Sequence, residues 1–77
     1  MIPPKLARAF EKVFRVDASG LTPSTSQDDI EGWDSVSHIE LILTLEMEFG
    51  VQFRTSEFSL MTSIADILVL LAEKGGL

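Results

Sequence analysis

The feature that most constrains the fold is a mid-chain segment, residues 34–50, with a clear start, a clear end and two apolar faces. Asp34 is a good N-cap because its carboxylate can accept hydrogen bonds from the free N–H groups of a first helical turn. Gly50 stands where a left-handed C-cap residue is needed. Residues 35–49 contain no Pro or Gly, so we predict a helix of about four turns.

Apolar residues fall on two nearly opposite sides of this helix when it is drawn as a wheel at about 100° per residue. One side carries Leu41, Ile42, Leu45 and Phe49, and the other carries Val36, Ile39, Leu43 and Met47. A surface helix needs only one apolar stripe to pack on its core. A second stripe means either full burial or a surface for a partner, and full burial would also bury Glu40, Glu46 and Glu48 at a high cost. We therefore interpret the second stripe as a docking surface.

The length and composition of the chain limit both its fold and its chemistry. Its 77 residues form one domain, 1–77, with a small core, which favours helices with local contacts. The chain has no Cys and one His, so we expect neither disulfides nor a metal site. The apolar run at 67–72 is too short to span a bilayer, and the first five residues lack the apolar core of a signal peptide. We expect a cytoplasmic monomer that does not insert into membranes.

Acidic residues dominate the middle of the chain. The formal net charge is −6, and residues 16–53 include eight acidic residues but no Lys or Arg. Such a surface repels nucleic acid and anionic membranes and favours basic patches on partners. The other interpretation is that a negative net charge simply keeps a small domain soluble.

Residues 1–33 predict a helix followed by a long loop. Two prolines precede an apolar face that repeats at helical spacing, which predicts a first helix at about 5–16. Residues 17–33 are rich in Ser, Thr, Asp, Gly and Pro and form a long loop. We expect Leu21 and Ile30 to attach this loop to the core, and long loops are usually functional or mobile.

The remaining residues predict two more helices after the mid-chain helix at about 35–49. An extended connector leads to a short helix at about 55–59. A last helix at about 63–74 is capped by Thr62 or Ser63. The predicted fold is all-α, a small irregular four-helix bundle with three main helices and one short helix.

Ser35, directly after the cap, is the residue with the most informative chemistry. A serine hydroxyl is a poor nucleophile unless a base lies beside it. Asp34 and His38 supply the residue types of a hydrolase triad, but a triad converges from separate elements on a cleft with an oxyanion hole. One helical turn in so small a domain offers no such cleft, so we expect no catalytic residues and no enzyme. We expect His38 to pack its ring near the core and to bond a loop carbonyl, with a part in orienting Ser35 as the alternative.

A phosphate on Ser35 would lie at a helix N-terminus, where free N–H groups and the helix dipole favour an anion. The segments that carry a family resemblance are Asp34-Ser35-Val36, His38-Ile39-Glu40-Leu41 and Leu45-Glu46-Met47-Glu48-Phe49-Gly50. They resemble the modification site and second helix of acyl carrier proteins, in which Asp-Ser-Leu opens an acidic helix that ends near Glu-Glu-Phe. The resemblance covers most of the chain, because the flanking helices and loop lengths also fit.

The resemblance implies a cofactor and its partners. Ser35 would carry a 4′-phosphopantetheine arm that a phosphopantetheinyl transferase takes from coenzyme A, and the thiol of the arm would hold acyl or aminoacyl groups as thioesters. Asp34 would cap the helix and help to orient Mg²⁺ during transfer. Other implied partners are acyl or aminoacyl ligases or transferases and ketosynthase-type enzymes of fatty acid, polyketide or related pathways. The implied partner-binding residues are Val36, Ile39, Glu40, Leu43, Glu46 and Met47.

Four positions depart from the family pattern. Val36 replaces Leu, Met47 replaces a commonly acidic residue, and Trp33 and His38 replace small or polar residues. Trp-Asp-Ser with a following His resembles stand-alone carriers of specialised pathways. We expect Trp33 either to pack over the helix start or to contact a partner. The alternative function is a non-covalent interaction module that uses the same exposed face, with Ser35 unmodified or simply phosphorylated.

Overall fold

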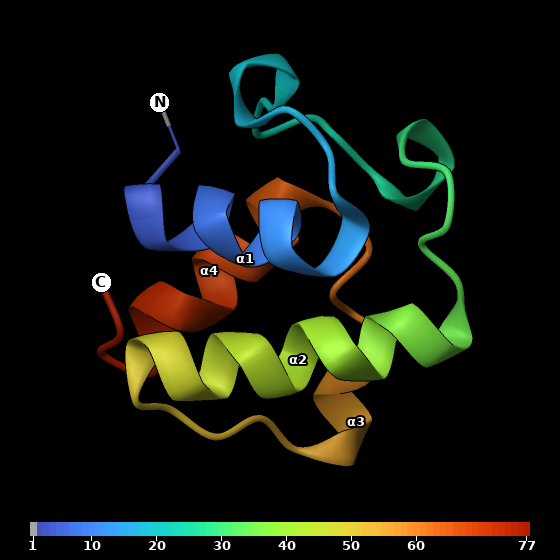
Figure 1. Ribbon diagram of the computed structural model, residues 1–77. Coiled ribbons are helices and arrows are strands. Elements are labelled where there is room, and N and C mark those ends of the chain that lie inside the picture. Colours follow the sequence, from blue (N-terminus) through green and yellow to red (C-terminus); the bar gives the residue numbers. More distant parts are fainter. Residues whose placement is uncertain (1) are drawn as a thin grey trace.

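The computed structural model describes residues 2–77 as a small bundle of helices (Figure 1). The helices are α1 (Pro4–Phe14), α2 (Ser35–Phe49), α3 (Thr55–Phe58) and α4 (Ile64–Glu73), with two single 3₁₀ turns, η1 (Ala18–Gly20) and η2 (Gln27–Asp29), between α1 and α2. Within the described residues there is no strand, only an isolated bridge between Ser26 and Ser63. The predicted all-α bundle of three main helices and one short helix is confirmed. None of these helices has both the length and the apolar character that a membrane crossing needs.

Helix α1 begins one residue before the predicted start and ends earlier than predicted. Its first residue is Pro4, and its inner face buries Leu6 and Phe10. We expected the helix to continue to residue 16, which is wrong by two residues. Arg15 takes a left-handed conformation with φ of 56°, and its N–H donates to the Glu11 carbonyl at 2.8 Å, which closes the helix after Phe14.

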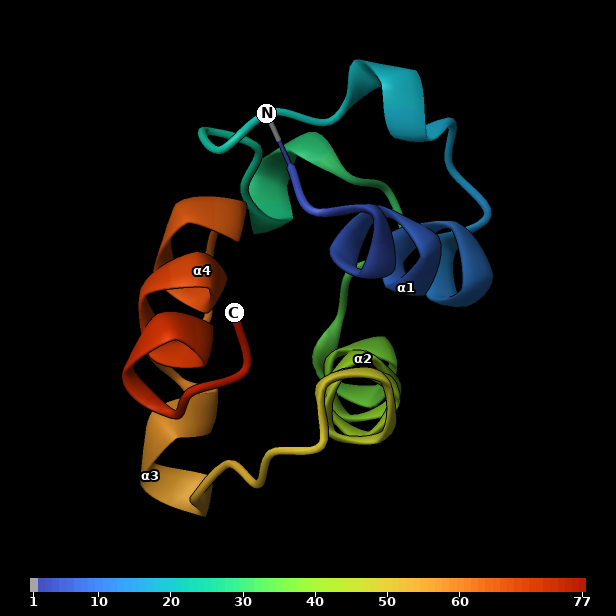
Figure 2. The same cartoon turned by 90° about the vertical axis from the view of Figure 1, so that its left-hand side faces the viewer.

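The core lies between α1 and α2 on one side and α4 on the other. Figures 1 and 2 show α1 beside α2, with α4 across from both. In Figure 2, α2 is seen almost end-on and presents only part of its circumference to the other helices. The largest fully buried side chains are Phe10, Leu6, Leu41, Ile42, Leu45, Met61, Ile64, Ile67 and Leu71.

The long loop before α2 is attached both by side chains and by its backbone. Ile30 is buried and Leu21 is half-buried against the core, as the sequence predicts. The backbone contacts were not predicted. The carbonyls of Thr25 and Pro23 accept the N–H groups of Ile64 and Ala65 at 2.9 and 2.8 Å, so the loop satisfies two of the free N–H groups at the start of α4.

The second half of the chain agrees closely with the predicted elements. The short helix spans Thr55–Phe58, one residue less than expected, and the last helix spans Ile64–Glu73 rather than 63–74. Ser63 is the N-cap of α4, and its hydroxyl accepts the N–H of Asp66 at 3.2 Å.

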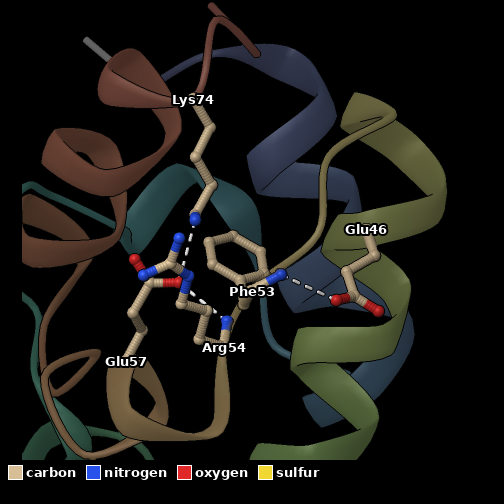
Figure 3. Close-up of polar contacts among 5 residues, drawn as sticks. All are labelled: Glu46, Phe53, Arg54, Glu57 and Lys74. Carbon is tan, nitrogen blue, oxygen red and sulfur yellow. Dashed lines mark hydrogen bonds and ion pairs between the residues drawn. The ribbon is translucent and has the colours of Figure 1, made fainter.

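A polar cluster ties α3 to the C-terminal end of α4 and ties the connector before α3 to the last turn of α2 (Figure 3). Glu57 accepts the Arg54 N–H at 2.7 Å and pairs with the Lys74 ammonium at 2.8 Å. The Arg54 N–H and then Lys74 lower the pKa of the Glu57 carboxyl below its usual range. The Phe53 N–H donates to Glu46 of α2 at 2.9 Å, and the Lys74 nitrogen lies 5.4 Å from the Phe53 ring centre. The connector and α3 are thus tied to both neighbouring helices.

Two leucines on α2 provide a matched test of which face is core. Leu41 is fully buried, whereas Leu43, two residues away, is exposed. We expect Leu41→Ala to lower the free energy of unfolding by about 2–5 kcal/mol, because it leaves a cavity in the core. Leu43→Ala should change it by less than about 1 kcal/mol. Urea unfolding of the two variants measures the difference, and similar losses would show that both stripes are core.

Candidate functional site

The start of α2 is capped by two side chains on either side of Ser35. One Asp34 carboxylate oxygen accepts the N–H groups of Val36 and Ser37 at 3.1 and 2.9 Å. The Ser37 hydroxyl accepts the Asp34 N–H at 2.9 Å and donates to the Gly32 carbonyl. This is a capping box with Ser in the place of the usual acidic partner. Because Asp34 and Ser37 make the cap, the exposed Ser35 hydroxyl is not needed for it.

The cap also sets the charge beside Ser35. The backbone N–H of Ser37 lowers the pKa of the Asp34 carboxyl, and the Ser37 hydroxyl and the Val36 N–H act in the same direction. Asp34 is therefore ionised at neutral pH, one residue before an exposed hydroxyl at the positive end of the helix dipole.

An open cleft of about 620 Å³ lies beside Ser35. Its walls come from η2, from the first turn of α2 and from the connection between α3 and α4. Phe58 and Ile39 supply apolar surface, while Gln27, Ser59 and Thr62 supply hydrogen-bonding groups. This cleft was not predicted from the sequence, because the residues of its walls, from Gln27 to Thr62, are up to 35 positions apart and no local pattern brings them together.

Trp33 and His38 form one side of this cleft, and both are buried. The Trp33 indole N–H donates to His38 Nδ1 at 2.9 Å, and His38 Nε2 lies 2.8 Å from the Phe58 carbonyl oxygen. Since an indole N–H can only donate and a carbonyl can only accept, His38 is neutral, with its proton on Nε2. Neither ring nitrogen is free to take a proton from Ser35, which excludes the hydrolase-type arrangement.

These contacts show how the two rings pack. His38 packs near the core, as predicted, but the carbonyl that it bonds belongs to Phe58, the last residue of α3, and not to a loop. Trp33 packs over the helix start, with its ring centre 5.4 Å from that of Phe10 and 5.5 Å from that of Phe14. Its indole is buried, so it is part of the core and not a surface for a partner.

The outer face of α2 is apolar and open to solvent. Its four apolar side chains, Val36, Ile39, Leu43 and Met47, are 69, 43, 55 and 86 % exposed. Glu40 is also exposed. Glu46 differs from the others, because one of its carboxylate oxygens accepts the Phe53 N–H. The predicted partner-binding residues thus lie on one side of α2, and Glu46 also has a structural contact.

Comparison with known proteins agrees with this arrangement. The family model described as "Phosphopantetheine attachment site" matches residues 4–71. The solution structure of the holo acyl carrier protein from Geobacter metallireducens matches with a TM-score of 0.79 and 35 % sequence identity. The match covers 94 % of this chain and 86 % of that chain.

The lowered pKa of Asp34 predicts a loss of stability in acid. A carboxyl whose pKa is lower in the folded state stabilises the fold above its unfolded pKa, and this contribution disappears as the pH falls through the folded value. We expect the free energy of unfolding to decrease below about pH 4, with Asp34 as one contributor. Asp34→Asn is the matched control, because Asn also caps helices but does not titrate in this range.

Chemical denaturation of both proteins between pH 2 and 6 measures this effect. The stability advantage of the wild type over Asp34→Asn should shrink as the pH falls. A difference that stays constant over this range would mean that the Asp34 carboxylate does not stabilise the cap.

Proposed function

This chain belongs to the acyl carrier protein family, and we propose that Ser35 is the residue to which its 4′-phosphopantetheine arm is attached. Proteins of this family are carriers and not enzymes, and the reactions on their cargo are catalysed by the proteins that bind them. The observation that carries the proposal is the exposed Ser35 hydroxyl, which follows a helix cap made by other side chains.

The surroundings of Ser35 suit a phosphodiester. The group would lie at the N-terminus of α2, where the helix dipole favours a negative charge. In the transfer, the Ser35 oxygen forms a bond to a phosphorus of coenzyme A, and the bond from that phosphorus to the adenosine bisphosphate breaks. The Ser35 proton passes to a base on the transferase, because the cap and His38 offer none. When bound, the arm supplies a thiol that carries acyl groups as thioesters.

The cleft beside Ser35 matches the chemistry of such an arm. Pantetheine has amide and hydroxyl groups as well as a branched apolar carbon. The cleft offers hydrogen-bonding side chains at Gln27, Ser59 and Thr62 and apolar surface at Ile39 and Phe58. These residues support an arm that can lie against the protein between encounters.

Mg²⁺ needs ligands from more than this chain. Among residues 2–77 there is no group of three His, Cys, Asp or Glu side chains that could hold a metal ion. We propose that Asp34 contributes to an ion held mainly by the transferase and coenzyme A, while it keeps its role in the cap.

The outer face of α2 is the proposed docking surface for phosphopantetheinyl transferases, acyl or aminoacyl ligases or transferases, and ketosynthase-type enzymes. Its exposed apolar residues begin at Val36, directly after Ser35, and Glu40 beside them can attract basic patches on those enzymes. We also propose that the pathway is fatty acid, polyketide or related specialised biosynthesis. Among the four departures from the family pattern, Met47 is the one most exposed to a partner, whereas Trp33 and His38 are buried.

The attachment site is tested by intact-mass measurement. Incubation of the apo protein with coenzyme A and a promiscuous phosphopantetheinyl transferase should increase the mass by one phosphopantetheine. Ser35→Ala should abolish the gain, whereas Ser37→Ala, which removes the other hydroxyl of the same turn, should retain it. An unchanged mass for the wild-type chain would favour the non-covalent interaction module.

The docking surface is tested with a matched pair of leucines. Leu43 on α2 is 55 % exposed and Leu60, before α4, is 58 % exposed. We expect Leu43→Glu to lower kcat/KM for arm transfer by about tenfold or more, since it places a charge in the centre of an apolar interface. Leu60→Glu should leave it within about twofold. Met47→Lys should act like Leu43→Glu.

Both leucine variants should unfold at nearly the wild-type temperature, because both side chains are exposed. Global unfolding of Leu43→Glu would instead place this stripe in the core. Equal transfer rates for the two variants would mean that the outer face of α2 is not the docking surface.

A further inference from the structure

The buried pair of Trp33 and His38 is not explained by the carrier function alone. The two rings are stacked, with centres 6.0 Å apart and an angle of 29° between their planes. Two hydrogen bonds run in series, from the Trp33 indole to His38 Nδ1 and from His38 Nε2–H to the Phe58 carbonyl. Only the Nε2–H tautomer of His38 allows both bonds, so the two hydrogen bonds can form in only one way.

These two hydrogen bonds join three elements around the cleft. Trp33 ends the long loop, His38 lies in the first turns of α2, and Phe58 ends α3. Residues three apart on a helix are neighbours, so His38 lies on the turn that begins with Ser35. All four residues line the cleft, and the position of its far wall relative to Ser35 therefore depends on the His38 ring.

Helix α3 needs such a contact because it cannot hold its position alone. A helix of four residues is far below the length at which a helix is stable by itself. The Glu57–Lys74 pair ties α3 to α4. The bond from His38 to the Phe58 carbonyl ties the end of α3 to α2 next to Ser35.

We propose that Trp33 and His38 are positioning residues for arm transfer. Through the Nε2–H tautomer of His38, they hold the end of α3 and the loop before Asp34 against the first turns of α2, so that the Ser35 hydroxyl is presented in one fixed geometry. Neither residue touches the reacting atoms. This inference rests on the proposed attachment at Ser35.

The geometry predicts a specific kinetic signature. Trp33→Phe keeps an aromatic ring against Phe10 and Phe14 but removes the indole donor. Because reaction rates are sensitive to small displacements of the reacting group, we expect kcat for arm transfer to fall by about tenfold. KM for the carrier should stay within about twofold, because the outer face of α2 is unchanged.

Variants of His38 distinguish positioning from simple packing. His38→Leu fills the site without either hydrogen bond and should lower kcat as Trp33→Phe does. His38→Gln has an amide that can donate to the Phe58 carbonyl and accept from the indole, so it should restore kcat to within about threefold of the wild type. All rates are measured at a temperature at which circular dichroism shows each variant to be folded.

Nitrogen-15 NMR of the wild-type imidazole gives a readout that does not depend on any variant. We expect Nε2 to be protonated and Nδ1 to be an acceptor coupled to the indole N–H of Trp33. A proton on Nδ1 in the neutral ring would overturn the proposal. If His38→Leu does not fold, Trp33→Phe and this spectrum decide the question.

The outcomes separate this inference from the function on which it rests. If the wild-type chain does not accept a phosphopantetheine arm, both the proposed attachment at Ser35 and the positioning role are overturned. A wild-type chain that takes the arm, with Trp33→Phe equally fast at saturation, would overturn only the positioning role. A rise in KM with unchanged kcat would also overturn it, because the pair would then act on docking.

Discussion

Helix α2 packs on the core through a single apolar stripe, and the placement of the functional groups depends on this packing. Leu41, Ile42 and Leu45 are buried against the other helices, and each contributes about 1.5–3 kcal/mol by leaving water. Because three buried side chains fix the rotation of the helix about its axis, its opposite face must point to solvent. The same rotation brings Ser35 to an exposed position at the end of the helix and His38 to the inside.

Capping and positioning at the start of α2 are carried by residues other than the one that reacts. Asp34 and Ser37 satisfy the first N–H groups, and Trp33 and His38 fill the space beneath. Ser35 is left without a structural task, and its modification does not require the cap to open. The carboxylate of Asp34 adds negative charge where basic partner surfaces are expected, which favours fast encounter more than tight binding.

Local signals made α2 the most predictable element, and contacts between distant residues were the least predictable. Asp34 and Gly50 are the residues directly before and after α2 and cap its two ends, so its bounds follow from the sequence. The end of α1 was missed because Arg15 adopts a left-handed conformation without the glycine that usually indicates it. The cleft depends on how the long loop and the α3–α4 connection fold back on α2, which no periodicity encodes. The contact of Glu46 with the Phe53 N–H was also missed, because it joins residues across a turn of irregular backbone.

The most direct test of this account is methyl NMR of the apo chain during titration with a phosphopantetheinyl transferase and a non-reactive coenzyme A analogue. The signals of Val36, Ile39 and Met47 should broaden or shift first, and those of Leu41 and Leu45 should stay unchanged while the core remains intact. Perturbations confined to exposed residues outside α2, such as Leu60, or spread evenly over the inner stripe of α2, would contradict the division of this helix into a core face and a docking face.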